Sequence, residues 1–238
     1  IEGGFDPVDL ARVVIEAVSP RVPDGSFAVK RIEGERVRVD ADIFSDGHDR
    51  ISAVVSHRRG TEPWSHVPMR PFGNDRWGAE FTPFATGEHS FTVTAWVDRF
   101  KTWRHDLERR VDADQEVSVE MLVGAELLRE VVASRPEAGS ELKAFLDRIT
   151  IGPMSQRIEA ALDERLAQLM ELFGPRRFAV TSGDPVRLWV DRKRARFSNW
   201  YELFPRSVGS DGLRHGTLRD VESRLDDIAG MGFDVLYL

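Results

Sequence analysis

The spacing of apolar residues changes twice along this chain, and this change limits the folds that the chain can adopt. Apolar residues alternate with charged ones at Val37, Val39, Ala41 and Ile43, and alternation returns over residues 91–97. A period of two is typical of half-buried strands. Turn signals separate these runs at Asp46-Gly47, Arg59-Gly60, Gly73-Asn74-Asp75 and Thr86-Gly87-Glu88. We interpret residues 12–110 as the short strands of an antiparallel β-sandwich of immunoglobulin or fibronectin type.

A helical period begins near residue 118. Apolar residues three or four positions apart occur at Met121, Leu122, Ala125, Leu128, Val131 and Val132. Ser140 is a capping residue for a short helix that runs to Ile149. A longer helix is predicted from Pro153 to Phe173, with Gly174 in a left-handed cap. These apolar stripes are too few for a free-standing bundle, so their partners are each other, the sandwich or a second copy.

Residues 200–238 have a third character. Trp200 to Phe204 is an aromatic strand, and Thr217 with Asp220 forms a capping signature for a helix that runs to Ile228. Phe233 to Leu238 is a nearly continuous apolar strand, as in a parallel sheet covered on both faces. Strand, helix and strand make one βαβ unit, which is at most the first unit of a (β/α)₈ barrel of about 250 residues. We therefore expect the chain to be truncated.

The fold class that we predict is multidomain, and it has four segments. Residues 12–117 form the β-sandwich, and residues 118–183 form a helical domain inserted before the last sandwich strand. Residues 184–196 hold that last strand, with Val186, Leu188 and Val190, and a linker. Residues 197–238 begin the barrel. The start, Ile1-Glu2-Gly3-Gly4, lacks an initiator Met, so we expect a processed or engineered N-terminus.

Composition excludes several classes of function. Lys and Arg number 33 against 40 Asp and Glu, and this net charge of −7 argues against nucleic acid or an anionic membrane as a partner. Cys is absent, which excludes disulfides, thiolate catalysis and Cys-ligated metals. No apolar run approaches the roughly 18 residues of a membrane span, and no signal peptide opens the chain. We expect a cytoplasmic protein.

No complete catalytic constellation is present. The six His residues lack any ligand spacing, so we predict no metal site, and His105 is favoured as a structural, hydrogen-bonded residue. The basic cluster Arg192-Lys193-Arg194-Ala195-Arg196 is favoured as a linker or solvated edge over a site for phosphate, RNA or an acidic partner. Trp64 and Trp77 lie near predicted loops, where they could stack on sugars, although core packing is favoured. Asp226-Asp227 indicates a solvated helix face.

The C-terminal segment resembles the entry into an α-amylase-family barrel, and more narrowly the GlgE-type α-1,4-glucan:maltose-1-phosphate maltosyltransferases. The motifs that carry the resemblance are Trp200-Tyr201-Glu202-Leu203-Phe204-Pro205-Arg206-Ser207, His215-Gly216-Thr217 and the stretch from Ile228 to Leu238. Looser matches are Thr102-Trp103-Arg104-His105, Leu122-Val123-Gly124 and Leu188-Trp189-Val190-Asp191-Arg192.

This resemblance implies a bacterial enzyme that transfers maltosyl from α-maltose 1-phosphate to an α-1,4-glucan and releases phosphate. It implies a retaining mechanism with an Asp nucleophile and a Glu acid–base, no metal or organic cofactor, and a homodimer formed through the sandwich and the helical insertion. The catalytic carboxylates and the phosphate contacts are expected beyond Leu238, so no catalytic residue is assigned. Glu202, Arg206 and Ser207, at or just beyond the C-terminal end of the first barrel strand, are the candidate substrate-binding residues.

Two alternatives remain open from the residues. The chain could be a non-catalytic module that binds α-glucan or mediates dimerisation, with retention in glucan gels that depends on Trp64 or Trp77. It could also belong to another hydrolase of the α-amylase clan. In every case we expect the isolated 238-residue chain to be inactive as a transferase.

Overall fold

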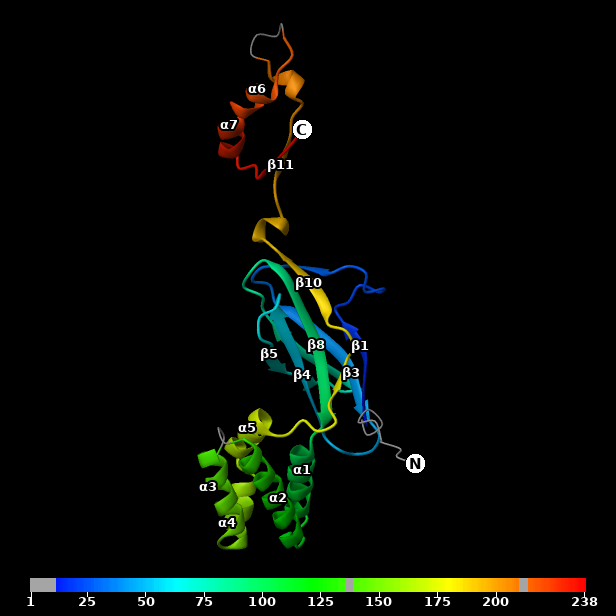
Figure 1. Cartoon of the computed structure of the whole chain (residues 1–238), viewed down its shortest axis with the longest axis vertical. Coiled ribbons are helices and arrows are strands. Elements are labelled where there is room, and N and C mark those ends of the chain that lie inside the picture. Colours follow the sequence, from blue (N-terminus) through cyan, green and yellow to red (C-terminus); the bar gives the residue numbers. More distant parts are fainter. Residues whose placement is uncertain (1–11, 136–138, 210–213) are drawn as a thin grey trace.

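The computed structural model describes residues 12–135, 139–209 and 214–238, so the N-terminal residues Ile1 to Gly4 lie outside the described part. Figure 1 shows three parts along the long axis of the molecule. Two β-sheets form the middle, a group of helices lies at one end, and a small unit with β11 lies at the other. No helix formed by the described residues is long and apolar enough to cross a membrane.

The middle part consists of two sheets that share one hydrophobic core. The first has the order β1 (Val13–Ser19), β3 (Val37–Ser45), β7 (Arg76–Phe81) and β6 (Arg70–Pro71). The second has the order β2 (Val29–Ile32), β10 (Val186–Asp191), β8 (Gly87–Val97), β4 (Ile51–Arg59) and β5 (Ser65–Pro68), and β9 (Val180–Thr181) pairs with β8. The apolar positions of β3 and β8 are buried in this core, as their alternation predicts. The arrangement is compatible with the predicted sandwich.

The prediction that all strands are antiparallel is wrong at β10. This strand lies between β2 and β8, and Leu188 pairs with Val29 in parallel register and with His89 in antiparallel register. A strand can be antiparallel to both of its neighbours only if the two neighbours run in the same direction. Because β2 and β8 run in opposite directions, β10 must be parallel to one of them. The sheet is therefore mixed, and β10 is a central strand.

The prediction of strands up to residue 110 is also wrong, because α1 (Arg99–Asp112) follows β8 directly. Asp98 caps this helix, since its Oδ1 accepts a hydrogen bond from Lys101 N at 2.9 Å. Its Oδ2 accepts one from Ser52 Oγ at 2.7 Å, which joins the start of the helix to β4. The buried residues Phe100, Trp103 and Leu107 have helical spacing, so a signal for this helix was present in the sequence.

The helices form a core of their own, although their apolar stripes suggested that they were too few. The helices after α1 are α2 (Ser118–Ser134), α3 (Gly139–Thr150), α4 (Met154–Ala161) and α5 (Glu164–Phe173). Their cluster contains fully buried residues from all five helices, among them Leu107, Leu128, Leu142, Ala160 and Leu166. All five helices lie between β8 and β9, which agrees with a helical insertion in a sheet domain.

Two details of the helical prediction need correction. The long helix from Pro153 to Phe173 is two helices, because Asp163 Oδ1 accepts a hydrogen bond from Arg165 N at 2.8 Å and caps α5. Gly174 is not left-handed, since its φ is −58°. Glycine is required there for space, because a Cβ would lie 2.3 Å from the carbonyl oxygen of Met170.

Candidate functional site

The C-terminal unit holds the three predicted site residues. Its strands β11 (Trp200–Glu202) and β12 (Val235–Tyr237) are parallel, as predicted, with Trp200 opposite Val235 and Glu202 opposite Tyr237. The connecting helix is divided into α6 (Leu218–Glu222) and α7 (Leu225–Gly230), where one helix was predicted. The carboxyl ends of both strands meet at one edge, which is the edge where ligands bind in parallel α/β sheets.

Glu202, Arg206 and Ser207 lie at or just after this edge, and all three are exposed. Glu202 is the last residue of β11, and Leu203 N donates to Tyr237 O at 2.9 Å. Arg206 and Ser207 lie on the short 3₁₀ helix η4 (Pro205–Val208). No hydrogen bond or ion pair within the described residues joins these three side chains to one another. The structure thus brings them to one edge, and their role stays a prediction.

Backbone contacts of Gly209 and Gly216 hold the backbone of η4 in place. Gly216 N donates to Arg206 O at 3.1 Å. A Cβ on Gly216 would lie 2.1 Å from Pro205 O, and a Cβ on Gly209 would lie 2.4 Å from Arg214 O. Only glycine permits two backbones to approach this closely. The two glycines therefore position Arg206 and Ser207.

Asp220 anchors Arg214 and Thr217 at the start of α6. Its Oδ2 accepts hydrogen bonds from Thr217 N and Thr217 Oγ1, both at 2.7 Å, so the predicted capping interaction is confirmed. Arg214 donates to both carboxylate oxygens, at 3.1 and 2.9 Å. The hydrogen bonds from Arg214 and then Thr217 hold the pKa of Asp220 well below its ordinary value of 3.8. Arg214 was not foreseen, because no capping or helix-spacing rule pairs a residue three positions before Thr217 with Asp220.

We expect Asp220→Asn to loosen α6. The substitution keeps the size of the side chain but removes the charge that Arg214 and Thr217 bind, so amide exchange over residues 217–222 should become faster at pH 7. Since the folded-state pKa is lowered, the contribution of Asp220 is present above the unfolded value of about 3.8 and is lost as pH falls through the lower folded value. Asp226→Asn on exposed α7 is the matched control, and equal protection in both variants would contradict the anchor.

The other candidate residues lie away from this edge. His105 Nε2 lies 2.6 Å from Arg50 Nη2, which agrees with a structural, hydrogen-bonded histidine. In the basic cluster, Arg194 pairs with Asp234 at 3.3 Å and Arg196 with Glu35 at 3.1 Å, so the cluster contacts both the C-terminal unit and the sheet domain. Asp227 pairs with Arg224 at 3.4 Å on the exposed face of α7.

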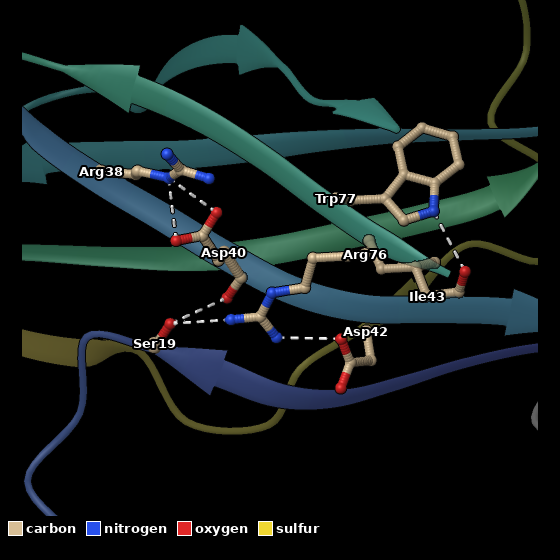
Figure 2. A network of polar contacts seen from close by, with 7 residues as sticks. All are labelled: Ser19, Arg38, Asp40, Asp42, Ile43, Arg76 and Trp77. Atoms are coloured by element: carbon tan, nitrogen blue, oxygen red, sulfur yellow. Dashed lines mark hydrogen bonds and ion pairs between the residues drawn. The ribbon is translucent and has the colours of Figure 1, made fainter. Parts of the chain in front are cut away.

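The two tryptophans considered for sugar binding differ in their surroundings. Trp64 is covered by the guanidinium of Arg58, whose Cζ lies 4.3 Å from the ring centroid. Trp77 donates from Nε1 to Ile43 O at 3.0 Å (Figure 2). It also lines a groove at the end of the sheets. Within the described ranges, no group of three or more His, Asp or Glu side chains is placed to hold a metal ion.

Comparison with known proteins shows similarity over nearly the whole chain. Residues 11–192 match the family described as alpha-1,4-glucan:maltose-1-phosphate maltosyltransferase, domain N/S. Proteins of the same name are similar in Chlorobaculum tepidum (43% identical over 229 residues, 95% of this chain and 34% of the relative) and in Myxococcus xanthus (41% over 239 residues, 96% and 36%). A third, from Methylacidiphilum infernorum, is 37% identical over 243 residues, 100% of this chain and 36% of the relative. The chain thus spans about a third of the length of these relatives.

Proposed function

Because the chain belongs to the alpha-1,4-glucan:maltose-1-phosphate maltosyltransferase family, we propose that it is the N-terminal, scaffolding part of such a transferase. The parent enzyme moves maltosyl from α-maltose 1-phosphate to the end of an α-1,4-glucan and releases phosphate. The observation that carries this proposal is the match of residues 11–192 to the family's N/S domain. The chain contributes a folded support, and the reacting carboxylates lie on the rest of the enzyme.

Residues 197–238 begin the catalytic (β/α)₈ barrel in this proposal. The parallel pair β11 and β12 with helices between them is the unit from which such a barrel is built. Large apolar side chains of this unit are exposed, including Trp200 at 61%, Met231 at 56% and Tyr237 at 56%. Neighbouring strand–helix units would bury these side chains and gain the corresponding hydrophobic free energy.

The chemistry that we propose for the parent is double displacement with retention. An Asp carboxylate on a later strand attacks the anomeric carbon while a Glu donates its proton to the bridging phosphate oxygen, so that the C–O bond breaks, phosphate leaves and a maltosyl-enzyme forms. The Glu then removes the proton from the acceptor hydroxyl, which attacks the same carbon and frees the Asp. Glu202, Arg206 and Ser207 lie at the mouth of the barrel and contact the sugar, and no metal or organic cofactor takes part.

We further propose that the enzyme is a cytoplasmic homodimer assembled through the sandwich and the helical unit, without a nucleic-acid or membrane partner. The support for the dimer is the outer face of α2. Three of its apolar side chains are exposed, namely Val119 at 63%, Leu122 at 64% and Val123 at 46%. Exposed apolar groups on one helix face are typical of an interface.

The proposal can be tested with a chimera of the Chlorobaculum tepidum relative. In this chimera, residues 1–238 of the present chain replace the first third of the relative and are followed by its remaining two thirds. We expect this chimera to release phosphate from α-maltose 1-phosphate with maltohexaose as acceptor, within about tenfold of the intact relative. The 238-residue chain alone and the relative without its first third should release none, because each lacks a part of the barrel. Sequencing the reading frame beyond the codon for Leu238 should show strand–helix repeats with an Asp and a Glu at strand ends.

A folded chimera without phosphate release, or release by the 238-residue chain itself, would contradict the proposal.

The same chimera tests the edge residues. Arg206→Ala should raise KM for the donor roughly tenfold, as expected for loss of a charge-assisted hydrogen bond to substrate. Arg219→Ala, on the exposed side of α6, should leave KM unchanged. Equal KM values in the two variants would assign Arg206 to structural support only.

A further inference from the structure

A groove of about 740 Å³ lies at the end of the two sheets that faces the helices. Trp77 and Ile43 come from the first sheet, and Ile51 and Pro68 come from the second. Lys101 of α1 and Glu171 of α5 complete one side. The groove is distant in the fold from the C-terminal unit, which lies at the opposite end of the sheets (Figure 1).

The indole of Trp77 is a fixed aromatic surface in this groove. Its ring is half-buried against the core of the sheets, and its Nε1–H is bonded to Ile43 O at 3.0 Å (Figure 2). On the outer face of the same strands, Arg76 donates to Asp42 Oδ1 at 2.9 Å and holds β7 against β3. A ring held in this way loses little conformational entropy when a ligand stacks on it.

The positive and negative charges of the side chains that line the groove are equal in number. Three are cationic and three anionic: Arg50, Arg70, Lys101, Asp49, Asp75 and Glu171. A phosphate or a nucleic acid would need an excess of positive charge. A neutral ligand rich in hydroxyl groups is the better fit, because each hydroxyl both donates to a carboxylate and accepts from a cation.

The turn between β6 and β7 presents polar groups beside Trp77. Gly73, Asn74 and Asp75 are all in the left-handed region, with φ of 93°, 48° and 58°. Asp75 O accepts from Ile43 N at 2.8 Å, which fixes the turn to β3. The side chains of Asn74 and Asp75 are exposed, and no partner for either occurs among the residues that the structure describes. They are therefore available as donor and acceptor groups for a ligand.

We propose that this groove is an oligosaccharide-binding site, in which one sugar ring stacks on Trp77 and its hydroxyls bond to Asn74 and Asp75. The assignment of the sugar as an α-1,4-linked gluco-oligosaccharide rests on the proposed function. Binding here is separate from the transfer site. It would hold a glucan chain on the surface of the enzyme during successive transfers.

Electrophoresis of the 238-residue chain in gels with and without glycogen tests this site. We expect glycogen to retard the wild-type chain, and titration with maltoheptaose to give a measurable Kd. Trp77→Ala should raise Kd roughly tenfold. Asn74→Gly should raise Kd about threefold, and it suits the fold because glycine tolerates the left-handed turn. Trp64→Ala is the matched control and should bind like wild type, since Arg58 already covers that ring.

Circular dichroism shows whether each variant is folded. If Trp77→Ala does not fold, the Kd of Asn74→Gly tests the site in its place. Absence of retardation of the wild-type chain, or wild-type binding by folded Trp77→Ala and Asn74→Gly, would overturn the site. Equal binding of maltoheptaose and cellohexaose would overturn the linkage assignment. These outcomes are independent of phosphate release by the chimera, so failure of the groove and failure of the proposed transferase role are distinguishable.

Discussion

Gly124→Ala is expected to destabilise the helical unit by about 3 kcal/mol, at the upper end of the range for overpacked cores. A Cβ at this position of α2 would lie 2.0 Å from Cζ2 of Trp103 and 2.6 Å from its Cε2. The indole cannot retreat, because it is buried among the helices and donates from Nε1 to Glu120 O at 2.7 Å. The added methyl group must therefore force α1 and α2 apart.

Urea unfolding followed by circular dichroism at 222 nm measures this effect. Gly139→Ala is the matched control, because a Cβ on Gly139 of α3 would meet nothing within 4 Å. That control should be neutral or gain about 0.5–1 kcal/mol from helix propensity. The double variant Gly124→Ala with Trp103→Leu should recover part of the loss, since the smaller side chain gives the methyl group room. Equal stability of Gly124→Ala and wild type would show that α1 and α2 are not packed through this contact.

Phe91→Ala is expected to destabilise the sheet domain by about 3–5 kcal/mol, the usual cost of removing a buried aromatic ring. Phe91 is fully buried, and on β8 it lies opposite His57 of β4 and Val186 of β10. Its ring also packs near that of Phe81, with centroids 6.3 Å apart. The cavity would therefore weaken contacts between both sheets.

Denaturant unfolding followed by tryptophan fluorescence would report this loss. Phe84→Ala removes the same side chain from a site that is 79% exposed, so its effect should stay within about 0.5 kcal/mol. A similar midpoint for both variants would contradict the position of Phe91 at the centre of the sheets. Because the groove at Trp77 is built on the same sheets, partial unfolding caused by Phe91→Ala should also abolish retardation by glycogen.

The local elements could be predicted from the sequence where short-range interactions decide them. Alternation over β3 places Val37, Val39 and Ala41 on one face, and any packing of that strand must bury this face. The bond from Thr217 to Asp220 spans three residues, so the pair is readable without the rest of the fold. The family resemblance was likewise carried by contiguous motifs, and it is confirmed by the match of residues 11–192 to the family's N/S domain and by relatives that align over 95% or more of this chain.

The predictions were wrong in two kinds of place. At α1 a helix signal was present in the local sequence but was overlooked, and at β10 the local sequence held no signal for the pairing of the strand. The start of α1 is indicated by the capping residue Asp98 and by the helical spacing of Phe100, Trp103 and Leu107. The strand prediction was nevertheless continued through this helix to residue 110. Nothing in the spacing of β10 could reveal its place between β2 and β8, since strand order depends on which distant faces bury each other.

For the candidate sites, too, some features follow from the local sequence and others follow only from the tertiary structure. By itself, the sequence determined that Glu202, Arg206 and Ser207 lie at or just after the end of an aromatic strand, because strand and turn signals act over a few residues. Only the tertiary structure decided that Arg214 binds Asp220 and that Gly216 touches the backbone of η4. It alone placed Trp77 beside Lys101 and Glu171 in one groove. Such contacts join residues far apart in the chain, and their geometry follows from the packing of sheets and helices and not from the spacing of residues along the sequence.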